Sequence, residues 1–84
     1  MPADPLEEID ERLTRAEMLV AAELRKAEET EERALGAAGE QRRRLTGAAR
    51  MHRRAAEVHA RAADLHRLHR EHESTRLGKA AGQA

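Results

Sequence analysis

Hydrophobic residues recur every three or four positions along the first third of the chain. Side chains at this spacing lie on one face of an α-helix. The sequence also offers a start for that helix, because Asp4 can cap the first free amide groups and Pro5 suits the first helical position. We therefore predict a helix over about residues 5–35. Its apolar series is Leu6, Ile9, Leu13, Ala16, Val20, Leu24 and Ala27.

The segment Gly36-Ala37-Ala38-Gly39 interrupts this pattern. Glycine is the preferred residue just past the end of a helix, so we predict that the first helix ends here and the chain turns over residues 36–39. The alternative is one continuous helix, because alanine is a strong helix former and a glycine costs only about 1 kcal/mol.

A seven-residue repeat follows the turn. Residues 50–56, 57–63 and 64–70 align with His52, His59 and His66 at one shared position. A sustained period of seven is typical of helices that pack as coiled coils. We predict a second helix over about residues 40–73, a single helical domain over residues 1–77, and a disordered tail over residues 78–84.

The two halves of the chain carry opposite charge. Residues 1–39 hold 11 acidic and five basic side chains, whereas residues 40–84 hold five acidic and 11 basic ones. Opposite charges attract, which favours folding one half onto the other. We therefore predict an all-α fold, an antiparallel two-helix hairpin. Centring it on residues 37–38 sets Leu13 against Ala62, Val20 against Ala55 and Leu24 against Met51.

The hydrophobic content is weak for a domain of 84 residues. Alanine supplies 18 of the 33 hydrophobic residues, there is no aromatic residue, and the absence of cysteine excludes a disulfide. Small domains with little apolar burial usually need a metal or a second chain. We expect two hairpins to form a four-helix bundle, or one hairpin to dock on a helical partner. The predicted interface is Leu6, Ile9, Leu13, Val20 and Leu24 against Met51, Ala55, Val58, Ala62 and Leu65.

Histidines form a ladder on the second helix. Its members are His52, His59 and His66, continued by His69 and His72. One interpretation places them in the interface, bonded to a glutamate of the acidic helix. A second is a metal site: His66 with His69, or His69 with His72, could chelate one ion across a helical turn, whereas the heptad histidines are too far apart to share an ion without a second chain. A third is pH sensitivity: buried neutral imidazoles would make stability fall as the pH drops below about 6.5.

A basic face on the second helix gives the main competing function. Arginine could contact phosphates and so bind nucleic acid without sequence preference. The acidic first helix and the lack of aromatic side chains for base stacking count against it. The residues concerned are Arg42, Arg43, Arg44, Arg50, Arg53 and Arg54.

The residue types do not favour catalysis. Ser74 is the only serine, and the sequence has neither cysteine nor tyrosine. Two helices without aromatic side chains offer little concavity for a substrate. We expect a non-catalytic helical interaction protein without a cofactor or bound metal. Lacking an apolar run of about 18 residues, it should not span a membrane, and we expect it in the cytoplasm of a bacterium.

Overall fold

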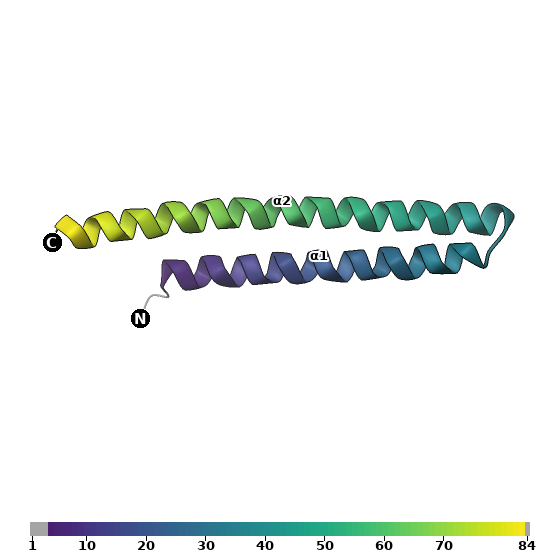
Figure 1. The fold of residues 1–84 in the computed structure, drawn as a ribbon, viewed down its shortest axis with the longest axis horizontal. Coiled ribbons are helices and arrows are strands. Elements are labelled where there is room, and N and C mark those ends of the chain that lie inside the picture. Colours follow the sequence, from purple (N-terminus) through teal and green to yellow (C-terminus); the bar gives the residue numbers. More distant parts are fainter. Residues whose placement is uncertain (1–3, 84) are drawn as a thin grey trace.

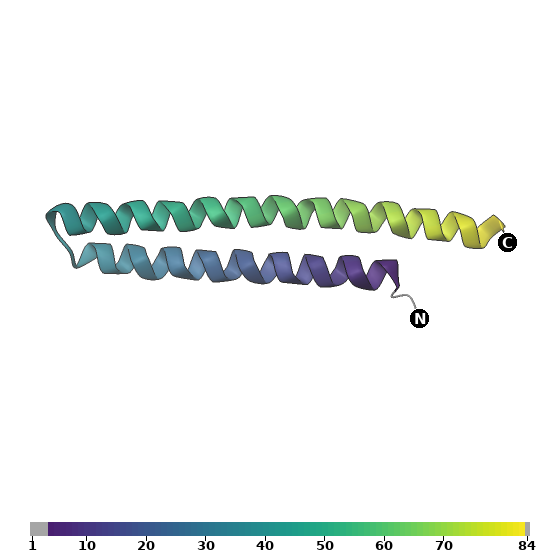
Figure 2. The same cartoon turned by 180° about the vertical axis from the view of Figure 1, so that it is seen from behind.

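The chain folds into two long helices that run antiparallel. The computed structural model describes residues 4–83, apart from the side chains of residues 80, 81 and 83. Helix α1 spans Pro5–Leu35 and helix α2 spans Gly39–Gln83, and the two pack side by side along the length of α1 (Figures 1 and 2). The predicted all-helical hairpin is confirmed. Residues 1–3 and 84, which the predicted domain and tail include, lie outside the described residues.

Helix α1 begins as its sequence predicts. The amide of Leu6 donates to Oδ1 of Asp4 at 2.9 Å, and the amide of Glu8 donates to the Asp4 carbonyl at 3.1 Å. Pro5 occupies the first turn. Backbone amides there have no intrahelical acceptor, so the missing amide hydrogen of proline costs no hydrogen bond. Two acidic residues, Glu7 and Glu8, follow in the same turn and complement the helix dipole.

The turn uses its two glycines differently. Gly36 ends α1 with φ −90° and ψ 0°, and its amide donates to the carbonyl of Arg33 at 3.2 Å. Any residue can adopt that conformation. Gly39 has φ +59°, in the left-handed region that side chains disfavour, and it begins α2. The reversal therefore depends on glycine at Gly39, and only Gly36, Ala37 and Ala38 lie between the two helices.

Helix α2 is longer than predicted. It continues to Gln83, so the predicted end near residue 73 and the disordered tail from residue 78 are wrong for the described residues. One local cause is the pair between Glu73 and Arg76, whose Nη2 donates to the carboxylate at 2.7 Å across one helical turn. The two glycines of this stretch, Gly78 and Gly82, cost too little to stop the helix. The last turns of α2 extend beyond the start of α1 (Figure 1).

The contact between the helices, here called the seam, is built almost entirely from alanine. Small side chains let the helices approach closely. Among the described residues, one isoleucine and six alanines are buried: Ile9, Ala16, Ala27, Ala34, Ala49, Ala56 and Ala63. The half-buried side chains beside them include Leu6, Leu13, Val20, Ala55 and Ala62 of the predicted interface.

Three residues predicted for the seam lie outside it. Met51, Val58 and Leu65 are 71%, 61% and 65% exposed, so their predicted packing against the first helix is wrong within the hairpin. Ala56 and Ala63, on the other side of the histidines, are buried instead, because alanine permits the closer helix approach. Leu24, predicted opposite Met51, is 37% exposed and lies beside Ala56 and Ala60 instead.

Candidate functional site

Side chains on the two sides of the seam form two flanks of different chemistry. Leu24 and Leu19 lie about 140° apart around α1, with the seam between them. On the side of Leu24, a groove between the helices is lined by Glu17, Val20, Ala21, Leu24, Ala60, Ala63, Asp64 and Arg67. On the side of Leu19, another is lined by Arg12, Arg15, Ala16, Leu19, His59, Ala62 and His66. We call these the ionic flank and the histidine flank.

The ionic flank carries three ion pairs that join the helices. Arg70 Nε donates to Oδ1 of Asp10 at 2.6 Å, and this carboxylate raises the pKa of the guanidinium. Arg67 Nη2 lies 3.6 Å from Oε1 of Glu17, and Arg53 donates twice to Oε1 of Glu31.

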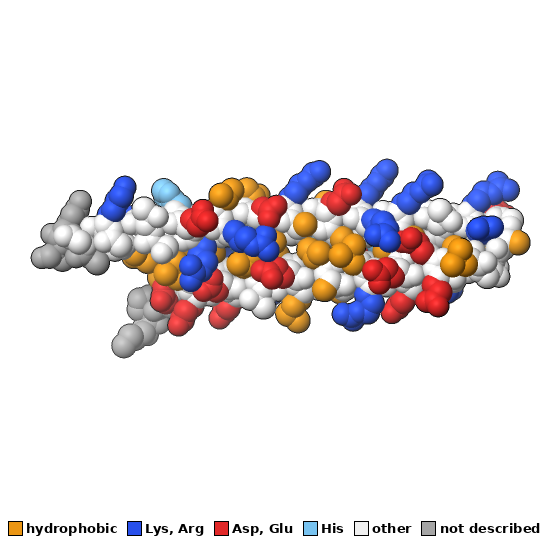
Figure 3. Space-filling view, in the orientation of Figure 1, with side chains coloured by type: hydrophobic (Ala, Val, Ile, Leu, Met, Phe, Trp, Pro, Cys, Tyr) orange, Lys and Arg blue, Asp and Glu red, His pale blue; other side chains and the backbone are white. Residues whose placement is uncertain are grey.

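On the face shown in Figure 3, acidic side chains predominate along α1 and basic side chains along α2, with hydrophobic side chains between them. In each interhelical pair of the ionic flank, the acid belongs to α1 and the base to α2. Part of the charge asymmetry of the sequence is therefore neutralised along this flank.

The histidine flank carries one interhelical bond of a different kind. Nδ1 of His52 lies 2.7 Å from Oε2 of Glu23, whose side chain is only 17% exposed. The bond to His52 holds the pKa of Glu23 below its ordinary value, against a smaller upward effect of burial. This is the predicted bond between a ladder histidine and a glutamate of the acidic helix.

The next two ladder histidines share a groove with arginines, and His59 also contributes to the lowered pKa of Glu23. His59 and His66 are half-buried and line one groove with Arg12 and Arg15, over Ala16 and Ala62. Among the described residues, none of these four side chains makes an ion pair or a side-chain hydrogen bond. The groove therefore concentrates positive and protonatable groups without a protein carboxylate in its lining.

The last two histidines leave the interhelical contact. His69 and His72 are exposed, and Nε2 of His69 lies 4.0 Å from Oε1 of Glu73 on the same helix. Arg76 is the main cause that lowers the pKa of Glu73, with smaller contributions from the two histidines.

No side-chain cluster suited to a metal is present in the described part of the chain. No group of three or more histidine or carboxylate side chains could hold an ion there. The one-turn pairs of His66 with His69 and of His69 with His72 thus lack a third ligand from these residues.

The premise for the predicted pH sensitivity is also changed. That expectation needs buried, neutral imidazoles, whereas the side chain of His52 is 34% exposed and bonds a carboxylate. The loss of stability below neutrality therefore stays a prediction.

The arginines of the predicted nucleic-acid face separate into two groups. Arg42, Arg43 and Arg50 line a hollow on one side of the first turns of α2. Arg53 is engaged by Glu31, and Arg44 lies 3.6 Å from Glu40. The sixth, Arg54, is exposed and makes no ion pair with the described residues. Only part of the predicted basic face is therefore free of acidic partners.

An exposed apolar row lies on the outside of α2. Met51, Val58 and Leu65 are spaced by seven residues, and Leu68 follows one turn later at 61% exposure. We call these four residues the outer stripe. Arg54 and Arg61 are interspersed along the same side of the helix.

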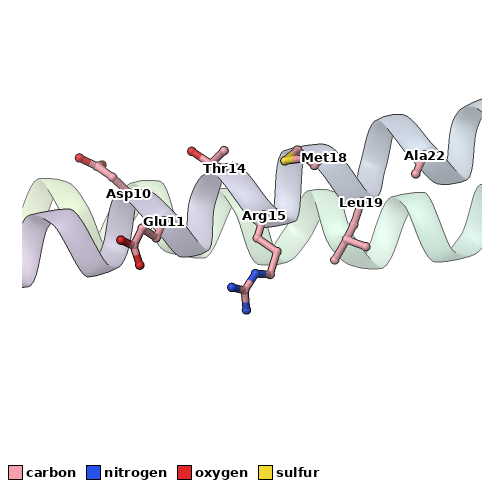
Figure 4. A pocket seen from close by; sticks show the side chains of 7 residues that line it. All are labelled: Asp10, Glu11, Thr14, Arg15, Met18, Leu19 and Ala22. Carbon is pink, nitrogen blue, oxygen red and sulfur yellow. The ribbon is translucent and has the colours of Figure 1, made fainter.

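Another hollow lies along α1 alone. Its lining side chains all project from this one helix, as Figure 4 shows: Asp10, Glu11, Thr14, Arg15, Met18, Leu19 and Ala22. A depression on one helix cannot surround a substrate and exclude water from it. Within residues 4–83, no helix is long and apolar enough to cross a membrane.

Two features of the flanks were missed at the level of sequence. The spacing of four residues favours pairing Arg12 with Glu8 and Arg15 with Glu11, yet neither pair is among the ion pairs of the described residues. Projecting both helices around the common seam would have placed these arginines beside the histidines. The bond between Glu73 and Arg76 near the end of α2 was also missed, because a disordered tail was predicted there.

Comparison of the chain with models of protein families, with curated proteins and with solved structures finds no match.

Proposed function

We propose that the chain is a non-catalytic assembly protein whose hairpin binds a second copy of itself through the outer stripe of α2. The observation that carries this proposal is the inversion of hydrophobic size between inside and outside. Among the described residues, those buried in the seam are one isoleucine and six alanines, whereas eight large hydrophobic side chains are exposed. Burial stabilises in proportion to apolar area, so most of the available hydrophobic free energy lies on the outside.

The spacing of the outer stripe suits a helical partner. Side chains repeated every seven residues follow one line along a helix and pack against the matching line of another. Val58 is at the centre, with Met51 and Leu65 seven residues away on either side. A second α2 running antiparallel about Val58 would therefore meet the same pattern, as a twofold-symmetric interface requires.

The charges around the stripe also fit a second copy. Arg54 and Arg61 lie along it, and Glu57 and Asp64 border it on one side. An antiparallel copy can therefore set arginines opposite carboxylates, and the aliphatic parts of the arginines can cover the apolar residues between them. The complete assembly would have four helices.

The mass of the particle in solution tests this proposal. Sedimentation equilibrium of the unmodified chain should give two chains per particle. Leu65→Gln should weaken the association at least about tenfold, since a polar group would then be buried at the contact. Leu35→Gln is the matched control, because Leu35 is similarly exposed at 76% but lies at the end of α1.

Two results would contradict the proposal. One is a single-chain mass for the unmodified protein at every concentration. The other is equal association of the Leu65→Gln and Leu35→Gln variants. Leu13 is half-buried beside the seam, so Leu13→Asp should instead disrupt the hairpin itself.

Nucleic-acid binding is a second candidate function. The observation that favours it is the gathering of Arg42, Arg43 and Arg50 in one hollow without an acidic partner among the described residues. Gel shifts with RNA and DNA at low salt should then be weakened by replacing these three arginines with glutamine. Absence of any shift at low salt would eliminate this candidate.

A further inference from the structure

We infer that the histidine flank contains a binding site for a small oxyanion, such as a sulfate or phosphate group, formed by Arg12, Arg15, His59 and His66. This inference goes beyond the proposed assembly and does not depend on it, because all four side chains belong to a single hairpin. The groove that they line has a volume of about 200 Å³, which is suited to a small anion.

The composition of the groove points to an anion. Two arginines of α1 and two histidines of α2 line it, and the remaining lining is Ala16, Leu19 and Ala62. Arginine donates paired hydrogen bonds that match the geometry of sulfate and phosphate oxygens. The lining itself contains no carboxylate, and the acids Asp10 and Glu11 of α1 line the separate hollow that Arg15 also borders (Figure 4).

The contrast with the rest of the hairpin supports a ligand site. On the ionic flank, each of Arg53, Arg67 and Arg70 is paired with an acid of α1. On the histidine flank, His52 is paired with Glu23. Positive groups beside the seam thus generally pair with a carboxylate. In the groove, α1 supplies arginines where a carboxylate would be expected. An anion would supply the missing negative charge.

The histidines would make binding depend on pH. Histidine gains positive charge as the pH falls below neutrality, which adds attraction for an anion. Beside His59 and His66, α1 places the charged residues Arg12, Arg15 and Glu23. The charge of Glu23 interacts with that of His59. Because Glu23 is bonded to His52, the effect of its negative charge on the groove is partly compensated.

Nuclear magnetic resonance of the histidine rings in the full chain gives a direct test. Sulfate is the best probe because it carries the same double negative charge at about pH 5.5 and about pH 8, so the pH changes only the protein. Titration against sodium chloride of equal ionic strength removes the effect of screening. The His59 and His66 signals should shift and saturate, whereas those of exposed His72 should not.

Variants identify the donors. Arg12→Gln combined with Arg15→Gln should weaken sulfate binding at least about tenfold, because two charge-assisted interactions are lost. Both side chains are exposed and make no ion pair among the described residues, so circular dichroism should show an intact hairpin. The control removes the same charge elsewhere, with Arg25→Gln combined with Arg54→Gln, and should bind sulfate normally. Leu65→Gln should also bind normally, which separates this inference from the proposed assembly.

Three outcomes would overturn the inference. The first is a shift that never saturates and is equal for all histidines. The second is unchanged binding when Arg12 and Arg15 are replaced. The third is equal affinity at the two pH values, which would remove the histidines from the site. Inorganic pyrophosphate and vesicles of phosphatidylglycerol extend the test, because saturation by pyrophosphate without binding to vesicles indicates a free anion as the ligand.

Discussion

The two flanks of the hairpin differ in how charged side chains of α1 and α2 are paired. On the ionic flank, acids of α1 meet arginines of α2 in three interhelical pairs. On the histidine flank, Glu23 of α1 bonds His52, and farther along Arg12 and Arg15 of α1 share a groove with His59 and His66. The first flank joins the helices in a defined register. The second keeps positive groups available at its surface.

This difference shows that net charge alone does not describe a helix. Residues 1–39 have an excess of acids, yet α1 turns two of its five basic residues toward the histidine groove. An acidic helix can therefore present a basic side. The position of each charge relative to the seam decides whether it stabilises the hairpin or remains free to bind.

The largest effect should come from filling the seam on which both flanks depend. Ala27 is 0% exposed, so Ala27→Leu introduces a side chain for which no space exists. Such overpacking costs about 1–3 kcal/mol, and separating the helices should weaken the interactions of both flanks together. Urea unfolding monitored by circular dichroism measures the loss. Ala21→Leu is the control, since Ala21 is exposed beside the groove of the ionic flank; equal destabilisation by both changes would argue against a close-packed seam.

The next effect should appear when the pH falls, and it should arise from the histidine flank. The bond to His52 lowers the pKa of Glu23 from its ordinary value of 4.5. A lowered pKa in the folded state adds stability above the ordinary value, and this stability is lost as the pH falls through the ordinary value toward the lowered one. From about pH 5 to about pH 3, the unmodified protein should therefore lose more stability than Glu23→Gln. Thermal melts measure the difference.

A matched variant identifies the source of that loss. Glu29 is exposed and has no ion-pair partner among the described residues, so Glu29→Gln should keep the pH dependence of the unmodified chain. The pKa of Glu73 is also lowered, by Arg76, but its contribution is common to all three proteins and cancels. Parallel pH profiles for Glu23→Gln and the unmodified chain would show that Glu23 is not the group concerned.

The smallest effect should come from one pair on the ionic flank. Arg53 and Glu31 each have about half of the side chain exposed, at 48%. Exposed pairs contribute only about 0.2–1 kcal/mol, so a double-mutant cycle with Arg53→Gln and Glu31→Gln should give a coupling in that range. The coupling should shrink in about 1 M salt, where charges are screened over a few ångströms. A coupling that is unaffected by salt would exclude an ion pair as its cause.

The sequence was sufficient for features that depend on neighbouring residues. Asp4, Pro5 and the glycines mark the ends of α1 and the turn, and opposite charge favoured the hairpin over one continuous helix. The glutamate partner of a ladder histidine also followed, because an antiparallel pairing centred on residues 37–38 sets position 23 opposite position 52.

Features that depend on distance between the helices could not be obtained in this way. Whether Met51, Val58 and Leu65 pack inside or lie outside is decided by how closely the alanines allow α1 to approach α2, and periodicity does not contain that distance. The same uncertainty concealed the groove of Arg12 and Arg15, since local spacing favoured their pairing with Glu8 and Glu11. The end of α2 was missed because the helical tendency of residues 74–83 was judged without the bond of Arg76 to Glu73.

The position of one imidazole tests the account most directly. In nuclear Overhauser spectra, ring protons of His52 should give cross-peaks to the side chain of Glu23, since their polar atoms lie 2.7 Å apart. A sample that mixes differently labelled chains should lack these cross-peaks between chains, because the contact lies within one hairpin. Cross-peaks from His52 only to residues of α2 would contradict the fold, the register and the placement of the ladder together.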